Sequence, residues 1–414
     1  MQHTYTLPGT LALLAALGTQ TLLAQGDALT QAPTLQDPPV EELQRAVQPE
    51  AEAIEAAEAE QQEVATTQSL EVTGYADAYY AAFTGDYERG EDGFDYVEFE
   101  TMSSRPNAFG LNSVGVATAY EADKIRANVE LFWGEVQETA WAGQVFKNAN
   151  VGYEVAEDFW IDAGYFSTYV GVESALPKDN MFSSVAVSTY QEPYYHAAVK
   201  ASYVGVENLE LELWLGNQFN GYNEVNKGKT LGAVARYTFA ENYTLSYTGT
   251  YGKMLGFYNE TPQAAVDFAD SSSVDLPLGL YNNVNLVATP TDQLEILLNG
   301  SFATLTNSGE NGDESITGVN GMVAARYFVS DLFAIAARGS FLAGDDVYGS
   351  ANDFTLSFQL TPTENSYVRL AGRTIGVGDT DGVSFFTDND GNATDRRFDL
   401  VLSAGVNLSK AFNF

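Results

Sequence analysis

The sequence contains no cysteine among its 414 residues, so no disulfide framework and no cysteine-ligated metal site can form. It also lacks a long apolar run after residue 24, whereas a membrane-spanning helix needs roughly 20 consecutive apolar residues. A polytopic helical membrane protein is therefore excluded. A membrane barrel is compatible with the mean hydropathy of -0.15, because its strands alternate apolar and polar residues.

Positive charge is scarce, with 19 Lys and Arg against 56 Asp and Glu and a formal net charge of -37. Phosphate binding needs clustered Lys and Arg, so nucleic acid is excluded as a partner. The chain has two histidines and no GxSxG elbow, phosphate loop, zinc pattern or dinucleotide fingerprint. We therefore expect no enzymatic activity, no metal and no cofactor.

The first 24 residues are typical of an export signal. Leu11 to Leu17 form a short apolar core, and Leu22-Leu23-Ala24 before Gln25 resembles a signal-peptidase site. No Lys or Arg precedes Leu11, which leaves a short membrane anchor as the alternative. We predict a cleaved signal peptide over residues 1–24.

Residues 25–68 change in composition, and Gln, Pro, Glu and Ala dominate. Ala and Glu favour helix, but Pro49 interrupts any helix that runs through it. The apolar stripe is thin, so we predict an acidic periplasmic segment that is flexible or partly helical. A short coiled coil or a plug segment is the alternative.

From residue 69 onward the hydrophobic period is two, as in a half-buried strand. In residues 125–133, Ile125, Val129 and Leu131 alternate with Arg126 and Glu130. Residues 209–215 and 294–301 alternate in the same way. About sixteen such segments, each about ten to fourteen residues long, suit tilted strands that cross a membrane.

The links between these segments alternate between short and long down most of the chain. Ala156-Glu157 and Ala240-Glu241 are short, whereas residues 83–107 and 167–192 are long. Outer-membrane barrels have short periplasmic turns and longer outside loops. Aromatic residues lie near the short links, where a girdle at the membrane interface is expected; they are Tyr203, Tyr237, Phe239, Tyr243, Tyr327 and Phe333.

The last segment alternates from Phe398 to the terminal Phe414, and one face is apolar except for Lys410. This ending resembles the assembly signal of outer-membrane proteins. We therefore predict an all-β fold, a transmembrane antiparallel β-barrel of about sixteen strands over residues 69–414. Its expected location is the outer membrane, in contact with lipid and with the assembly machinery through Phe414.

Three stretches resemble the OmpL-like β-barrel porins. They are residues 74–80 (GYADAYY), residues 192–203 (EPYYHAAVKASY) and residues 216–222 (GNQFNGY). The first looks like the family's opening strand, the second like its central segment and the third like the Asn-Gly close of the next strand. The resemblance covers roughly residues 70–414 and implies a porin-like barrel without indicating the solute.

A barrel of this size encloses an aqueous channel, and both signs of charge face inward. The predicted pore-lining residues are Asp77, Arg126, Glu130, Asp162, His196, Lys200, Glu210, Glu212, Arg236, Glu295, Arg326, Arg338, Arg369 and Arg373. The long link after Ser167 supplies the candidates for a constriction, namely Glu173, Lys178 and Asp179.

These charges have two interpretations. They simply solvate a wet wall, or the long link folds inward and its carboxylates face an Arg-rich wall across a transverse field. In the second case, neutralising Arg338, Arg369 and Arg373 changes the ion selectivity.

The outer links are acidic, as in residues 86–100 and 379–390, and such a mouth concentrates cations. Adaptation to external salt explains the same acidity. We expect passive diffusion of small hydrophilic solutes and ions with a weak cation preference. The alternatives are a solute-selective channel, for instance for sugars that stack on Trp160, Trp214, Tyr190 or Tyr194, and a structural or adhesive surface barrel with an occluded lumen.

The outward side of the first strand is small at Val72, Gly74, Ala76 and Ala78. Small residues suit close packing between barrels in a homotrimer, and a strand bent at Gly74 is the alternative.

Overall fold

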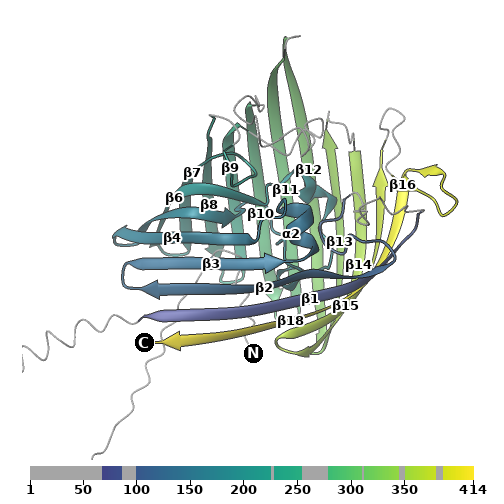
Figure 1. The fold of residues 1–414 in the computed structure, drawn as a ribbon, viewed down its shortest axis with the longest axis horizontal. Helices are drawn as coiled ribbons and strands as arrows, with labels where there is room; N and C mark the ends of the chain where they lie inside the picture. Colours follow the sequence, from purple (N-terminus) through teal and green to yellow (C-terminus); the bar gives the residue numbers. More distant parts are fainter. Residues whose placement is uncertain are drawn as a thin grey trace, which may run out of the picture.

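Sixteen antiparallel strands pair edge to edge and close into a barrel in the computed structural model (Figure 1). The structure describes residues 68–85, 99–224, 228–253, 278–309, 312–344, 350–378 and 386–414. The predicted signal peptide and acidic segment lie outside these residues, apart from Gln68. The closed barrel confirms the predicted fold class.

The strands follow the chain around the barrel, and β1 is hydrogen-bonded to both β2 and β18. The first eight are β1 (Ser69–Phe83), β2 (Ala108–Ala122), β3 (Ile125–Trp133), β4 (Phe146–Ala156), β5 (Phe159–Ser167), β6 (Tyr195–Val206), β7 (Leu209–Gly216) and β8 (Thr230–Phe239). The other eight are β9 (Tyr243–Lys253), β10 (Leu278–Thr291), β11 (Leu294–Gly309), β12 (Gly312–Ser330), β13 (Phe333–Gly344), β14 (Ser350–Thr363), β15 (Ser366–Val377) and β18 (Arg396–Asn413).

Short turns join the strands at one end of the barrel and mostly longer links join them at the other, as the sequence predicted. The exception is the link between β11 and β12, where two residues separate Gly309 from Gly312. Asp123, Asp158 and Asn208 in the short turns have positive φ values of 42°, 58° and 62°. Asp and Asn tolerate this left-handed conformation better than most residues, so they suit two-residue hairpins. The turn chemistry therefore fixes which end of the barrel is tight.

The first and last strands complete the ring. The register runs from Ser69 opposite Asn413 to Phe83 opposite Asp399. The amide of Phe414 donates to the carbonyl of Gln68 at 2.9 Å, which extends the pairing to the last residue. The alternation of the final segment is thus the alternation of the strand that closes the barrel.

Each strand has an apolar outward face and a mostly polar inward face. In β18, Phe398 and Leu400 are 50% and 43% exposed, whereas Arg397 and Asp399 are each 1% exposed. Side chains of a strand point alternately to its two sides, so the period of two in the sequence separates the two faces. The inward side chains are buried because other parts of the chain fill much of the interior.

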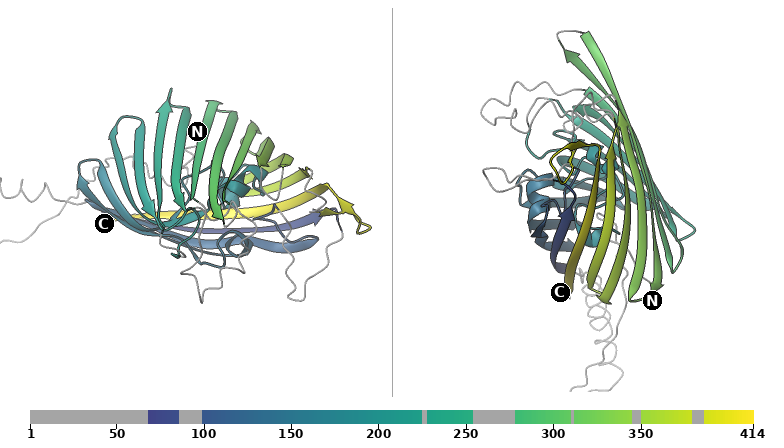
Figure 2. Two further views of the ribbon diagram at one scale, coloured as in Figure 1. Left: turned by 90° about the horizontal axis from the view of Figure 1, so that it is seen from above. Right: turned by 90° about the vertical axis from the view of Figure 1, so that its right-hand side faces the viewer.

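That filling comes from the long links. The link between β3 and β4 holds α2 (Glu135–Ala140), which lies inside the ring of strands in Figure 2. The link between β5 and β6 holds two 3-10 turns, η1 (Pro177–Asp179) and η2 (Val187–Gln191). The last link carries a small hairpin of β16 (Phe386–Thr387) and β17 (Ala393–Thr394). None of the helices in the described residues is long and apolar enough to cross a membrane.

Candidate functional site

The link between β5 and β6, residues 168–194, folds into the barrel; we call it L3. Its two ends are joined where the amide of Thr168 donates to the carbonyl of Tyr194 at 2.9 Å. From this base L3 crosses the lumen, so that η2 packs against β12, β13 and β14 and η1 packs against β18. The inward folding that the sequence left open is therefore present.

Arg338 of β13 holds the middle of L3. Its guanidinium donates to Glu173 Oε1 at 2.7 Å and to the carbonyl oxygens of Ser184 and Val185 at 2.8 and 3.1 Å. It also donates to Asp353 of β14 at 3.1 Å. The five donors of a guanidinium form a fixed fork, which suits a side chain that ties two carboxylates and a loop backbone together.

Arg369 of β15 holds the region around η1. It donates to the carbonyl oxygens of Pro177 and Asn180 at 2.6 and 2.7 Å, and to that of Phe182 at 3.4 Å. Its Nε donates to Gln359 at 2.8 Å. These acceptors are neutral oxygens. The positive charge of Arg369 is therefore stabilised by carbonyl dipoles, most of them from the main chain of L3.

A row of asparagines on β10, β11 and β12 holds the base of L3. Asn283 accepts from the amide of Gly171 at 3.1 Å, and Asn299 donates to Glu192 Oε1 at 3.0 Å. Asn320 donates to Gln191 Oε1 at 3.1 Å. A carboxamide both donates and accepts, so one residue type matches the amides, carbonyls and carboxylate of L3.

Residues 99–107, the part of the first long link that precedes β2, also lie inside the barrel; we call them the L1 segment. Glu100 accepts from Arg373 at 2.6 Å and from Arg397 at 2.5 Å. Ser103 Oγ donates to the carbonyl of Ser183 at 3.2 Å, which joins the L1 segment directly to L3. The two segments therefore share the wall formed by β13–β18.

An apolar cluster packs between the segments inside the lumen. Met102, Val136 and Leu176 come from the L1 segment, α2 and L3, and all three are at most 2% exposed. Trp141 stacks on Tyr195 with ring centroids 5.2 Å apart and an interplanar angle of 23°. This internal core stabilises the in-folded links by burial of apolar surface, as in a soluble domain.

The structure brings most of the predicted pore-lining charges into pairs, either on adjacent strands or, for Arg126 and Asp162, across the intervening strand β4. The pairs are Arg126 with Asp162 at 2.5 Å, Lys200 with Glu212 at 3.0 Å, Arg326 with Glu295 at 2.6 Å and Arg236 with Glu210. Glu130 pairs with Lys147 at 3.0 Å, a base that the sequence reasoning did not select. Adjacent strands place opposite charges side by side, and direct pairing removes most of the net field between them.

Asp77 and His196 are placed differently. Asp77 is fully buried and accepts from Asn112 and from Tyr367, each at 2.5 Å. His196 is 1% exposed, and its ring stacks on Trp214 at 4.5 Å with an interplanar angle of 11°. Both side chains are packed into the wall, away from the remaining open space.

The three constriction candidates separate into two groups. Glu173 bonds to Arg338 on the far wall, as the transverse arrangement requires. Lys178 and Asp179 bond to each other at 2.6 Å and remain about one-fifth exposed. Asp353, Glu100 and Arg397 were missed, although the polar alternation of Asp353, Thr355, Ser357 and Gln359 marked the inward face of β14.

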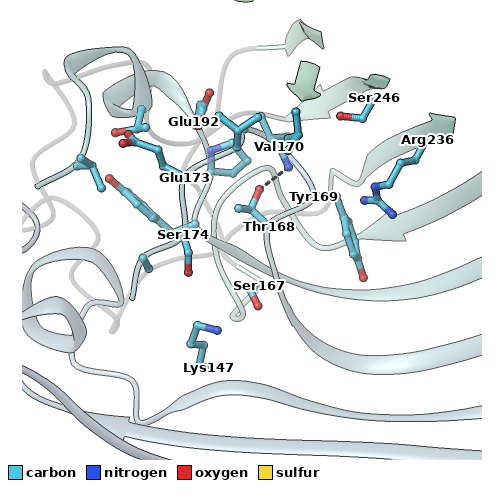
Figure 3. Close-up of a pocket in the computed structure, with 18 of the residues that line it drawn as sticks. Lys147, Ser167, Thr168, Tyr169, Val170, Glu173, Ser174, Glu192, Arg236 and Ser246 are labelled. Carbon is cyan, nitrogen blue, oxygen red and sulfur yellow. Dashed lines mark hydrogen bonds between the residues drawn. The ribbon is translucent and has the colours of Figure 1, made fainter. Parts of the chain in front are cut away.

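An open pocket remains beside L3 (Figure 3). L3 borders it on one side with Thr168, Tyr169 and Glu173, and the barrel wall borders it on the other with Arg236 and Ser246. Lys147 and Tyr194 line it as well. We call this space the L3 pocket.

Burial raises the pKa of Glu192, which lines the L3 pocket, to about 8, and the nearby charge of Glu173 adds to this shift. The hydrogen bond from Asn299 acts in the opposite direction. A carboxyl in this environment is stabilised in its neutral form.

Of the four aromatic residues considered for sugar stacking, Tyr194 lines the L3 pocket. Trp214 is covered by His196, Trp160 by the guanidinium of Arg126 at 4.4 Å, and Tyr190 by Phe99 at 4.9 Å.

A closed sixteen-stranded barrel with an apolar outside, one tight-turned end and a long link folded into its lumen defines the class of outer-membrane channels. The family model described as "Putative beta-barrel porin-2, OmpL-like" matches residues 69–408. The chain belongs to this family, and it is an outer-membrane porin.

Solved structures show the same fold at low sequence identity. OmpT of Vibrio cholerae has a TM-score of 0.54 and 13% identity, with 82% of this chain and 98% of that chain covered. An anion-selective porin from Comamonas acidovorans has a TM-score of 0.55 and 9% identity, over 82% and 100% of the two chains. The outer-membrane channel DcaP of Acinetobacter baumannii has a TM-score of 0.54 and 13% identity, over 83% and 98%. No curated protein matches the sequence.

Proposed function

We propose that this porin lets small hydrophilic solutes and ions diffuse passively across the outer membrane, and that they pass L3 through the L3 pocket. The observation that carries the proposal is the seating of L3 across the lumen, which leaves this pocket between the loop and the wall of β8–β9. Solutes that pass there meet polar groups of both signs and the aromatic faces of Tyr169 and Tyr194. We assign the chain no enzymatic role.

A weak cation preference is the finer part of the proposal. Lys147 and Arg236 line the pocket, and each is bonded to a carboxylate, so their positive charge is locally balanced. Glu173, which also lines the pocket, is balanced in turn by Arg338. Hydrogen bonds from Asn392 lower the pKa of Asp388 in the last long link, so this residue stays ionised at the outer end. An acidic mouth above a balanced constriction enriches cations by a modest factor.

The absence of native cysteine allows a direct test. Ser246→Cys places a thiol on the pocket wall, and Thr118→Cys on the outward face of β2 is the control for effects of the reagents that do not involve the lumen. Single-channel current is recorded in a planar bilayer while a cationic or an anionic thiol reagent of similar size is added. We expect stepwise block of the Ser246→Cys channel, faster with the cationic reagent, and no block of the control. Modification without block would reject the L3 pocket as the route.

We further propose that the porin assembles as a homotrimer. The outward side chains of Gly74, Ala76 and Ala78 are small in the structure's register, and a Cβ added at Gly74 would meet nothing within 4 Å. One of the similar structures, an in-vitro folded OmpT of Vibrio cholerae, is described as a trimer form. Gly74→Trp should convert the detergent-extracted oligomer into monomer while the folded barrel is retained. A trimer that survives this substitution would place the contact elsewhere.

The remaining proposals concern export and assembly. Residues 1–24 are removed as a signal peptide, residues 25–68 form a periplasmic segment, and Phe414 is read by the assembly machinery. N-terminal sequencing of the purified protein tests the first, since it should begin at Gln25.

A further inference from the structure

Asp353 of β14 lies at the centre of the buried charges, and its side chain is fully buried. Its Oδ2 accepts from Arg338 Nη2 at 3.1 Å and from Arg373 Nε at 3.2 Å. One carboxylate thus lies between two guanidinium groups, one from each of the strands β13 and β15 that flank β14. Two positive groups at this spacing repel each other unless a negative charge stands between them.

The two arginines bind different loops. Arg338 donates to Glu173 and to the carbonyls of Ser184 and Val185, all in L3. Arg373 donates to Glu100 in the L1 segment at 2.6 Å. Asp353 also contacts L3 itself, because its Oδ1 accepts from the amide of Val187 at 3.2 Å.

We propose that Asp353 is a positioning residue that seats the L1 segment and L3 together, so that the two links move as one unit. A continuous series of alternating charges runs from Glu173 through Arg338, Asp353 and Arg373 to Glu100. Removal of one member of a buried series leaves its partners uncompensated, which costs more than one surface ion pair. Loss of the Asp353 charge should therefore destabilise the seating of both loops.

The direct contact between the loops strengthens this coupling. Ser103 of the L1 segment donates to the carbonyl of Ser183, and the hydroxyl of Ser183 lies 2.5 Å from that of Ser403 on β18. If one loop leaves the wall, the other loses a polar partner as well as a share of the charge series. Coupling between two sites is reciprocal at equilibrium, so each loop should respond equally to release of the other.

Thiol labelling in the otherwise cysteine-free chain measures the seating of each loop. Ala186→Cys reports on L3 and Thr101→Cys on the L1 segment; the native residues are 0% and 6% exposed. The labelling rates are compared in the parent, in Asp353→Asn and in Asp399→Asn. Asp399 is a buried carboxylate that bonds to Arg397 at 2.7 Å, and Arg397 bonds to Glu100 of the L1 segment. Asp399 therefore lies at the L1 end of the series without a bond to Arg338, so its amide variant is a control for the loss of a buried carboxylate that does not stand between the two loops.

We expect Asp353→Asn to raise both labelling rates about tenfold or more, and Asp399→Asn to change the rate at Ala186→Cys much less. Heat-modifiable mobility on a denaturing gel verifies that each variant is a folded barrel. An Asp353→Asn effect confined to one loop, or equal to that of Asp399→Asn at both, would overturn the proposal.

A second pair of variants covers the case in which Asp353→Asn does not fold. Both substitutions of this pair lie in the loops and leave the strands unchanged. Glu100→Gln should raise the labelling of Ala186→Cys in L3, and Glu173→Gln should raise that of Thr101→Cys in the L1 segment. Independent responses would show that the loops are seated separately. The readout does not depend on the solute or on conductance, so the proposal stands or fails apart from the proposed function.

Discussion

Arg126 of β3 and Asp162 of β5 form a two-point ion pair, with Nε–Oδ1 and Nη2–Oδ2 distances of 2.7 and 2.5 Å, although β4 runs between their strands. Gly152 of β4 lies opposite both residues in the register. A Cβ at this position would lie 2.1 Å from Asp162 Oδ1. The missing side chain is what allows the pair to close across a strand.

Gly152→Val should therefore separate this ion pair and destabilise the barrel. The side chain of Arg126 is 36% exposed, so solvent screening limits the expected loss to about 1–2 kcal/mol. The midpoint of urea unfolding in lipid vesicles measures the loss. Gly300→Val is the control, since a Cβ there meets nothing within 4 Å. Equal midpoints for the two variants would contradict the role of Gly152.

Arg369→Met should loosen L3 because the carbonyls of Pro177, Asn180 and Phe182 lose their common donor. We expect spontaneous closures of the single channel to become more frequent by about tenfold, the effect of about 1.4 kcal/mol. Arg369→Lys should give an intermediate result, because an ammonium cannot reproduce the planar fork of donors.

The same recordings distinguish gating from selectivity at Arg369. We expect the reversal potential under a salt gradient to change little, since this guanidinium is buried against the loop. A large shift of the reversal potential with quiet channels would instead support the earlier interpretation of Arg369 as a selectivity charge.

The seating of L3 should weaken as the pH rises, because burial raises the pKa of Glu192 to about 8 from an ordinary value of 4.5. The neutral carboxyl is favoured in the seated loop, whereas a released loop ionises it at the ordinary pKa. Stability of the seat is therefore full below about pH 4.5, is lost progressively up to about pH 8 and is constant above that.

Current fluctuations recorded from pH 4 to 9 test this direction and should increase across that window. Glu192→Gln is isosteric with the neutral acid and should remain quiet at every pH. If the variant keeps the pH dependence of the parent, another group is responsible.

Removal of Phe414 should reduce the yield of assembled barrel. The terminal residue continues the pairing of β1 and β18 through its 2.9 Å bond to Gln68, and its ring is 71% exposed. Phe414→Tyr keeps an aromatic terminus and should assemble normally, whereas Phe414→Ser should accumulate unfolded in the periplasm. The ratio of heat-modifiable to unfolded protein on gels provides the measure. Normal assembly of Phe414→Ser would remove Phe414 from the assembly signal.

The barrel could be predicted from the sequence because its cause is local. An alternating segment such as residues 125–133 shows the period of two without reference to any other segment. The short turns carry their own chemistry, as Asp158 and Asn208 show. Closure of the ring required only that the first and last segments be strands of compatible length.

The filling of the lumen could not be predicted in the same way. Half of the hydrogen-bond acceptors of Arg338 and Arg369 are main-chain carbonyls of L3, which every residue type carries, so the sequence does not indicate them. Arg373 and Glu100 are more than 270 residues apart along the chain. Alternation identified such residues as inward-facing, but it could not tell an arginine in water from one that is bonded to a loop.

These contacts with main-chain carbonyls have a consequence for how this porin can change. Arg338 and Arg369 together bind the carbonyls of Pro177, Asn180, Phe182, Ser184 and Val185. At these positions the barrel wall fixes the backbone path of L3 and does not require a particular side chain. A residue on the pocket side, such as Val172, can then be exchanged while the loop keeps its course. The strands therefore determine the conformation of L3, while its pocket-facing side chains can vary. New permeation properties can arise by substitution in the loop without changes to the strands.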